Sequence, residues 1–221
     1  MRLAKDGVPV VIHDATLRRT GLAWGEVAKL TSGQLANENV GSWFNRAHPA
    51  LAREAFERQR VPTLAQVFDL LRERPGTIYV EMKTEADSSS DLVQALPDAI
   101  IASGFQDRVV VVSFDLPAVA KIKTLNSSIR TGALFTPRNR PDVSWRADSM
   151  LSAARDCGAD ELLPHRLLAR PKLAEKAHAR RLPVVVWTVD DPDWLARART
   201  LGIQALITNN PARMLAVYGP A

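Results

Sequence analysis

Three polar residues near apolar segments have side chains suited to the chemistry of phosphate esters. His13 follows the β-branched run 8–12, which an Asp-Gly turn signal precedes. We expect this run to be a strand that delivers His13 at its carboxyl end. Imidazole exchanges protons near neutral pH, so His13 could serve as a general acid or base. A surface histidine behind a core strand would have the same pattern.

Glu81 and Lys83 end a second apolar segment and alternate along it, so a strand would direct both side chains to one face. A carboxylate can hold a divalent cation, and the cation and a lysine can both offset the charge of a phosphate group. The same two residues could equally form a buried ion pair. The residues alone leave both interpretations open.

The segments that would position these side chains alternate between strand and helix from Thr63 onward. Thr63 and Gln66 predict a capping box at the start of the first helix, and a Pro-Gly pair at 75–76 ends it. The expected strands are 77–82, 108–113, 130–135, 161–163, 183–188 and 203–207. The expected helices are 92–103, 117–125, 149–156, 171–181, 192–201 and one from 211, with a loop over 136–141. Before this region, 24–44 is expected to be irregular, with at most short helical turns over 26–35, and 51–60 is expected to lie on the surface.

Nearly unbroken apolar strands are typical of a parallel sheet that is covered on both faces. The alternation therefore predicts an α/β barrel or a doubly wound sheet. Polar residues at the carboxyl ends of these strands favour the barrel, because active sites are built on that face. Those residues are His13, Glu81, Lys83, Ser113 and Thr188.

The segment Lys5–Thr20 is similar to a motif of the glycerophosphodiester phosphodiesterase family, with Ala4 where threonine is usual. Further matches follow in the family's order: Gly41-Ser42-Trp43-Phe44, Val61-Pro62-Thr63-Leu64, Glu81-Met82-Lys83, Ser113-Phe114-Asp115, Trp187-Thr188-Val189-Asp190 and Ile207-Thr208. Together they span nearly the whole chain. Asn209 stands where the family commonly has aspartate, and His48, His165 and His178 match no motif and are expected to be structural or exposed.

The resemblance implies a TIM-like barrel and hydrolysis of glycerophosphodiesters to glycerol 3-phosphate and an alcohol, a reaction of lipid and glycerol metabolism. His13 would be one half of an acid and base pair. Glu81 would be a ligand of a divalent cation, Ca²⁺ or Mg²⁺, and Lys83 would face the substrate phosphate. Trp187 would lie against the glycerol moiety.

Three segments of the family, reading H-R-G, P-E-N-T and E-x-D, have no counterpart in the sequence. We therefore expect residues 1–221 to be one phosphodiesterase domain, incomplete at the amino terminus, whose barrel lacks its first strands and helix. An open edge of that barrel could pair with a second copy and form a homo-oligomer. The alternative function is an inactive truncated barrel that acts as a phosphate-binding or interaction module.

The composition is that of a soluble globular protein, with 221 residues, 46% hydrophobic and 24% charged. A net charge of +5 suits an anionic small-molecule substrate. Basic residues are interleaved with acidic ones and lack a matching aromatic set, so we expect no nucleic-acid partner. No apolar run approaches the ~20 residues of a membrane span, which predicts no stable membrane anchor and a cytoplasmic location. The single cysteine, Cys157, is expected to be a structural thiol.

Overall fold

The structure is a computed structural model that describes residues 1–21, 24–84, 89–137 and 146–218. The chain forms two compact units. The first comprises Met1–Val110 with Leu125–Ile129, and the second comprises Val111–Thr124 with Arg130–Ala221. Strand β4, Val109–Ser113, is buried throughout and is where the chain passes from the first unit to the second. The loop expected over 136–141 lies outside the described residues from 138 onward.

The first unit begins with a hairpin in which β1, Arg2–Leu3, pairs antiparallel with β2, Pro9–Val10. Gly7 supplies the left-handed backbone of the turn, with φ +77°. The strand predicted over 8–12 is longer than β2. The pairing with β1 ends at Val10, and the Val11 N–H donates instead to the Pro62 carbonyl at 2.8 Å. His13 therefore lies in irregular backbone three residues beyond β2.

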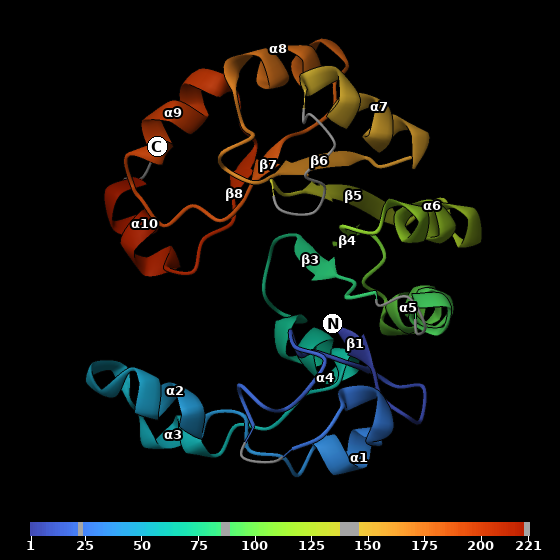
Figure 1. The fold of residues 1–221 in the computed structure, drawn as a ribbon, viewed down its shortest axis with the longest axis vertical. Coiled ribbons are helices and arrows are strands. Elements are labelled where there is room, and N and C mark those ends of the chain that lie inside the picture. The colour runs from blue at the N-terminus through green and yellow to red at the C-terminus, as the bar shows by residue number, and fades with distance from the viewer. Residues whose placement is uncertain (22–23, 85–88, 138–145, 219–221) are drawn as a thin grey trace. The chain divides into compact units, whose positions relative to one another are not determined.

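Short helices follow the hairpin, as expected for 24–44. They are η1, Val27–Lys29, and α1, Ser32–Leu35, and the latter begins with a capping box formed by Thr31 and Gln34. The sequence did not predict the next three helices, α2 (Ser42–Ala47), η2 (Pro49–Leu51) and α3 (Glu54–Glu57). Figure 1 shows α2 and α3 side by side.

Helix α4, Leu64–Leu71, begins with the predicted capping box. The Gln66 N–H donates to Thr63 Oγ1 at 3.2 Å, and the Thr63 N–H donates to Gln66 Oε1 at 2.9 Å. Strand β3, Ile78–Glu81, and helix α5, Ser89–Ser103, complete the first unit near the positions expected for them. Phe68 of α4 is fully buried and stacks on Phe105 with ring centroids 4.8 Å apart.

The second unit contains the parallel pairs that the apolar segments predict. Strand β5, Arg130–Phe135, pairs with β6, Glu161–Pro164, and β7, Val185–Val186, pairs with β8, Ala205–Leu206. Isolated parallel bridges from Leu162 to Val184 and from His165 to Trp187 join β6 to β7. The predicted strands 183–188 and 203–207 are longer than β7 and β8, because single hydrogen bonds continue the pairing beyond the regular ladder, such as that from the Ile207 N–H to the Val186 carbonyl.

Among its described residues, this unit has five helices that belong mainly to it: α6 (Leu116–Leu125), α7 (Ala147–Asp156), α8 (Pro171–Ala179), α9 (Trp194–Leu201) and α10 (Pro211–Tyr218). In Figure 1, α7 to α10 follow one another along one side of strands β5 to β8. An apolar core lies between these helices and the strands and includes Phe135, Leu162 and Val186. Within the described residues no helix is both long enough and apolar enough to cross a bilayer.

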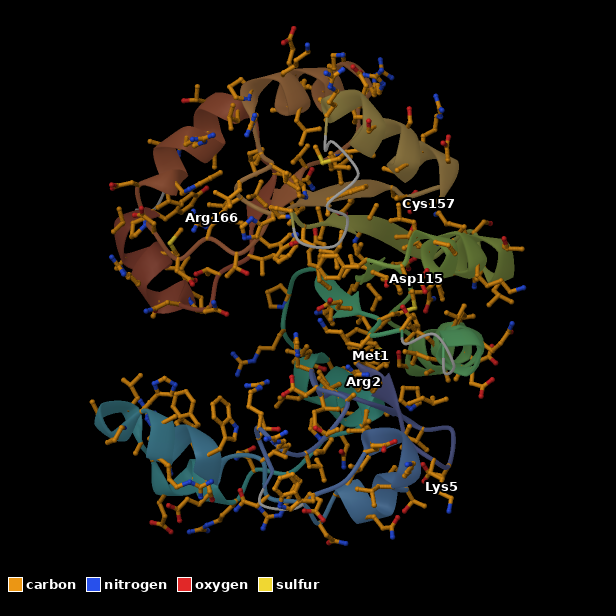
Figure 2. All side chains as sticks on the ribbon, in the orientation of Figure 1. Met1, Arg2, Lys5, Asp115, Cys157 and Arg166 are labelled. Atoms are coloured by element: carbon orange, nitrogen blue, oxygen red, sulfur yellow. The ribbon has the colours of Figure 1, made fainter. Side chains whose placement is uncertain are left out.

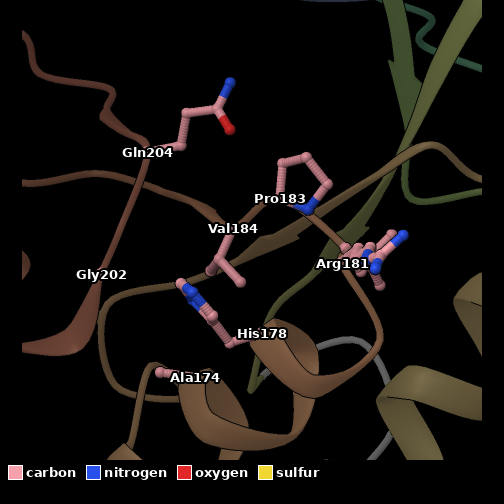
Figure 3. Close-up of a pocket in the computed structure, with 8 residues that line it drawn as sticks. Ala174, His178, Arg181, Pro183, Val184, Gly202 and Gln204 are labelled. Carbon is pink, nitrogen blue, oxygen red and sulfur yellow. The ribbon is translucent and has the colours of Figure 1, made fainter.

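A glycine of the second unit has a left-handed backbone conformation that favours glycine over other residues. Gly202 ends α9 in the left-handed conformation, with φ +62°, and a Cβ placed there would lie 3.4 Å from the His178 ring. Both residues line a pocket of about 290 Å³ (Figure 3). His178 is exposed, as the sequence predicts.

Candidate functional site

His13 is held by its neighbours on both sides. Its side chain is 69% exposed, and Nδ1 lies 2.7 Å from Asp14 Oδ1. Its carbonyl oxygen accepts a hydrogen bond of 3.1 Å from Arg2 Nε on β1. One nitrogen of the ring is thus bound to a carboxylate, and no described residue forms a hydrogen bond with Nε2.

Asp14 is fixed in turn by Arg19. Arg19 Nε donates to Oδ2 at 2.6 Å and Nη2 donates to Oδ1 at 3.1 Å. These bonds lower the pKa of Asp14 to about 2 and raise that of Arg19. An ionised carboxylate can only accept hydrogen bonds, so His13 carries its proton on Nδ1. Nε2 is therefore the nitrogen available to a substrate.

Glu81 and Lys83 form an ion pair. The sequence predicts both residues on one strand, but β3 ends at Glu81, so Lys83 lies two residues beyond it. Lys83 Nζ donates to Glu81 Oε1 at 2.6 Å. The side chains are 17% exposed for Lys83 and 30% exposed for Glu81. The ion pair is therefore present and partly buried. Met1 lies against the same segment, where its carbonyl accepts the Lys83 N–H at 3.1 Å.

Arg2 is a residue of this site that the sequence motifs did not single out. It follows Met1 at the start of β1 (Figure 2) and lines a pocket of about 260 Å³ together with Lys83, Thr16 and Glu26. Two cationic side chains in one pocket suit an anionic ligand. The hydrogen bond from Arg2 to the His13 carbonyl connects this pocket to the histidine. No local sequence pattern marks Arg2, since its role depends on where the hairpin places it.

Trp187 belongs to the second unit, whereas His13, Glu81 and Lys83 belong to the first. Its indole Nε1 donates to the Leu163 carbonyl at 2.8 Å, and its ring makes edge contacts with Phe114 and His165 at centroid distances of 5.3 and 5.1 Å. His165, expected to be structural or exposed, packs on this tryptophan. The substrate role of Trp187 stays a prediction.

Asn209 has a defined structural role. Its backbone N–H and its Nδ2 donate to the two oxygens of Asp190 at 2.7 and 3.0 Å, and Thr208 Oγ1 adds a third bond at 2.9 Å. These bonds, led by that from the Asn209 side chain, lower the pKa of Asp190. An amide at 209 thus fits the carboxylate at 190.

A divalent cation needs more ligands than the described residues bring together. Over the described ranges there is no group of three or more His, Cys, Asp or Glu side chains that could hold a metal ion. Glu81 provides one carboxylate, and Lys83 is bound to it. Since Ca²⁺ and Mg²⁺ take about six or more oxygen ligands, this part of the chain does not by itself form a cation site.

Comparison with known proteins agrees with the α/β fold and with the family that the sequence motifs resemble. The sequence profile of the glycerophosphoryl diester phosphodiesterase family matches residues 1–213. A glycerophosphodiester phosphodiesterase of Caldanaerobacter subterraneus subsp. tengcongensis is 26% identical over 215 residues, which are 97% of this chain and 82% of that protein. One from Bacillus subtilis is 25% identical over 218 residues, covering 96% of this chain and 72% of the other. The structure of an Oleispira antarctica phosphodiesterase in complex with the product sn-glycerol-3-phosphate has a TM-score of 0.83 at 19% identity, covering 98% of this chain and 81% of that one.

The fold is therefore α/β, of the TIM-like barrel type found in phosphodiesterases, which confirms the predicted fold class. The fold and the relatives together place this protein in the class of phosphoric diester hydrolases. The chain belongs to the glycerophosphoryl diester phosphodiesterase family, as the sequence motifs predict. This family is generally dependent on divalent metal ions.

Proposed function

We propose that this chain hydrolyses glycerophosphodiesters to glycerol 3-phosphate and an alcohol, with His13 as an acid and base catalyst. The observation that carries the proposal is the orientation of His13, whose Nδ1 is bonded to Asp14 at 2.7 Å while Nε2 is left for a substrate. Family membership supports the reaction class. The relative whose structure contains sn-glycerol-3-phosphate supports the product.

The reaction requires two proton transfers. A water oxygen attacks phosphorus, the bond between phosphorus and the alcohol oxygen breaks, and the departing oxygen gains a proton while the attacking water loses one. We assign one of these transfers to Nε2 of His13, which accepts a proton when the ring is neutral and donates one when it is charged. Such a transfer typically contributes ~10²–10⁴-fold to the rate.

Lys83 and Arg2 are proposed to bind the anionic phosphate. They line one pocket and are both cationic, so they favour the charge that develops on the phosphoryl oxygens. Glu81 holds Lys83 through the 2.6 Å ion pair and restricts where its ammonium group can lie. A ligand phosphate would compete with Glu81 for the protons of Lys83.

A divalent cation, Ca²⁺ or Mg²⁺, is proposed as the cofactor, with Glu81 as one of its ligands. When bound, it would offset phosphate charge as a Lewis acid. Its role can be tested by removing metal with a chelator and titrating each cation back, both into the wild-type chain and into Glu81→Gln. The variant should need a higher cation concentration than wild type. Glu73→Gln, at an exposed glutamate that forms no ion pair with the described residues, is the control and should behave as wild type.

The test of the function is release of glycerol 3-phosphate from glycerophosphodiesters with different alcohols, followed with a coupled dehydrogenase. His13→Ala should reduce kcat by ~10²–10⁴-fold. His178→Ala, at an exposed histidine of the second unit, should leave kcat unchanged. No release by the wild-type chain with either cation, together with calorimetric binding of glycerol 3-phosphate, would favour the inactive phosphate-binding module instead.

Four further properties are predicted for this chain. They are a single domain over residues 1–221, a cytoplasmic location, a homo-oligomer and the absence of nucleic-acid and membrane partners. Sedimentation of the purified chain, with and without a nucleic-acid duplex or lipid vesicles, would measure its oligomeric state and its binding to nucleic acid and to membranes. A monodisperse monomer would contradict the oligomer.

A further inference from the structure

The motif Gly41-Ser42-Trp43-Phe44 has no part in the chemistry described above, yet its tryptophan contacts the residues behind His13. The guanidinium carbon of Arg19 lies 5.4 Å from the centroid of the Trp43 ring. A cation at this distance over an indole is attracted to the ring face. The same guanidinium makes the two hydrogen bonds to Asp14. A continuous set of contacts therefore runs from Trp43 through Arg19 and Asp14 to the ring of His13.

We propose that Trp43 and Arg19 are positioning residues that hold Asp14 against His13 and so keep Nε2 of the histidine available to the substrate. The inference rests on the proposed catalytic role of His13. It assigns a function to helix α2, which carries Trp43 and which the sequence did not predict.

An arginine suits position 19 for geometric reasons. Its planar fork binds both oxygens of Asp14, at 2.6 and 3.1 Å, which fixes the plane of the carboxylate as well as its position. The side chain of Arg19 is 53% exposed and that of Asp14 is 24% exposed, so water has access to the pair. The indole of Trp43 restricts the guanidinium on one side. A lysine would keep the charge and lose the second hydrogen bond.

Helix α2 is in turn fixed, so that Trp43 has a defined position. Asn39 Oδ1 accepts the N–H groups of Gly41 and Ser42 at 3.1 and 3.0 Å, and Asn39 Nδ2 donates to the Glu57 carbonyl at 2.7 Å. Asn39 thus joins the start of α2 to the end of α3. Ring contacts of Phe44 with Trp43 and Phe56, at centroid distances of 6.0 and 5.5 Å, add to this connection.

The chain offers a matched control for Arg19. Its neighbour Arg18 also lies over a tryptophan, with its guanidinium carbon 5.4 Å from the ring of Trp24. The described contacts give Arg18 no carboxylate partner, and Trp24 is 82% exposed. The two arginines are therefore adjacent in the chain and each contacts a tryptophan ring, but only Arg19 is bonded to Asp14.

The test compares Arg19→Gln, Arg19→Lys, Trp43→Leu and Arg18→Gln in the full chain. Arg19→Gln should lower kcat by about 10- to 100-fold, since outer partners of a functional histidine have effects of this size. KM should stay within about twofold, because these residues do not touch the substrate. Arg19→Lys should recover part of kcat, Trp43→Leu should show a smaller fall, and Arg18→Gln should match wild type.

A second readout does not depend on activity. The ¹³C and ¹⁵N shifts of the His13 ring report which nitrogen is protonated, with the signals assigned by their loss in His13→Ala. The Nδ1–H form should dominate in wild type and in Arg18→Gln and should decrease in Arg19→Gln. Unchanged ring shifts and unchanged kcat in Arg19→Gln would overturn the inference. An inactive wild-type chain whose ring shifts respond to Arg19→Gln would instead count against the proposed function alone.

Discussion

Gly41 lies where helix α2 approaches α3, and replacing it by alanine tests whether this approach is required. A Cβ at Gly41 would lie 1.7 Å from the carbonyl oxygen of Phe56 and 2.7 Å from its carbon. The backbone φ of Gly41 is −109°, which any residue adopts, so the expected cost comes from this contact alone. Since an ordinary C···O contact is about 3.3 Å, the two segments would have to separate by about 1.6 Å. Because a backbone atom must move, we expect the free energy of unfolding to fall by about 3 kcal/mol, at the upper end of overpacking costs.

The assay is urea unfolding of Gly41→Ala, combined with limited proteolysis to detect local opening of α2 and α3. Gly33→Ala is the matched control, because a Cβ there would meet only Thr31 Oγ1 at 4.0 Å. In helix α1 this control should be neutral or stabilising by up to about 1 kcal/mol. An unchanged unfolding midpoint and an unchanged proteolysis rate in Gly41→Ala would refute the argument.

Three further outcomes are expected. Gly132→Ala should lower the free energy of unfolding in urea by about 2 kcal/mol, because its Cβ would lie 2.3 Å from a methyl group of Leu163. An unfolding midpoint equal to that of the wild type would contradict this close packing. The Cys157 thiol is buried, which raises its pKa, so it should react with a thiol reagent only at the rate of unfolding; rapid reaction in the folded chain would be inconsistent with this burial. The pKa of Asp14 is lowered from its ordinary value to about 2, and screening at the exposed Arg19 limits the stabilisation to about 1 kcal/mol. This stabilisation is fully present above about pH 4 and is lost as the pH falls toward 2. The difference in unfolding free energy between wild type and Asp14→Asn should therefore shrink between pH 6 and pH 3.

The sequence predicts those features that depend on residues close together in the chain. The capping box of Thr63 and Gln66 is a local exchange of hydrogen bonds and was found as expected. The strand 130–135 matches β5 because its apolar run is buried against neighbours on both faces. The family assignment succeeded for a related reason, since each motif is a short run of residues whose order can be recognised directly.

The parts that were missed depend on pairing between distant segments. The strand after the first turn is shorter than its β-branched run because Val11 bonds to Pro62, and no local pattern reveals this partner. Arg2 and Lys83 are 81 positions apart, and only the fold brings them to one pocket. The helices α2 and α3 have six and four residues, too few for a clear apolar period.

The three hydrogen bonds to Asp190 have a consequence for the evolution of this family. Asn209 Nδ2 lies 3.0 Å from an Asp190 oxygen, so an aspartate at 209 would bring two carboxylates into contact. Relatives with aspartate at the position of Asn209 should therefore tend to have a neutral or basic residue at the position of Asp190, or should place that aspartate elsewhere. The two positions would then change together during descent, and an alignment of many relatives would show them as a coupled pair. Independent variation of the two positions would mean that solvent screens this contact enough to remove the constraint.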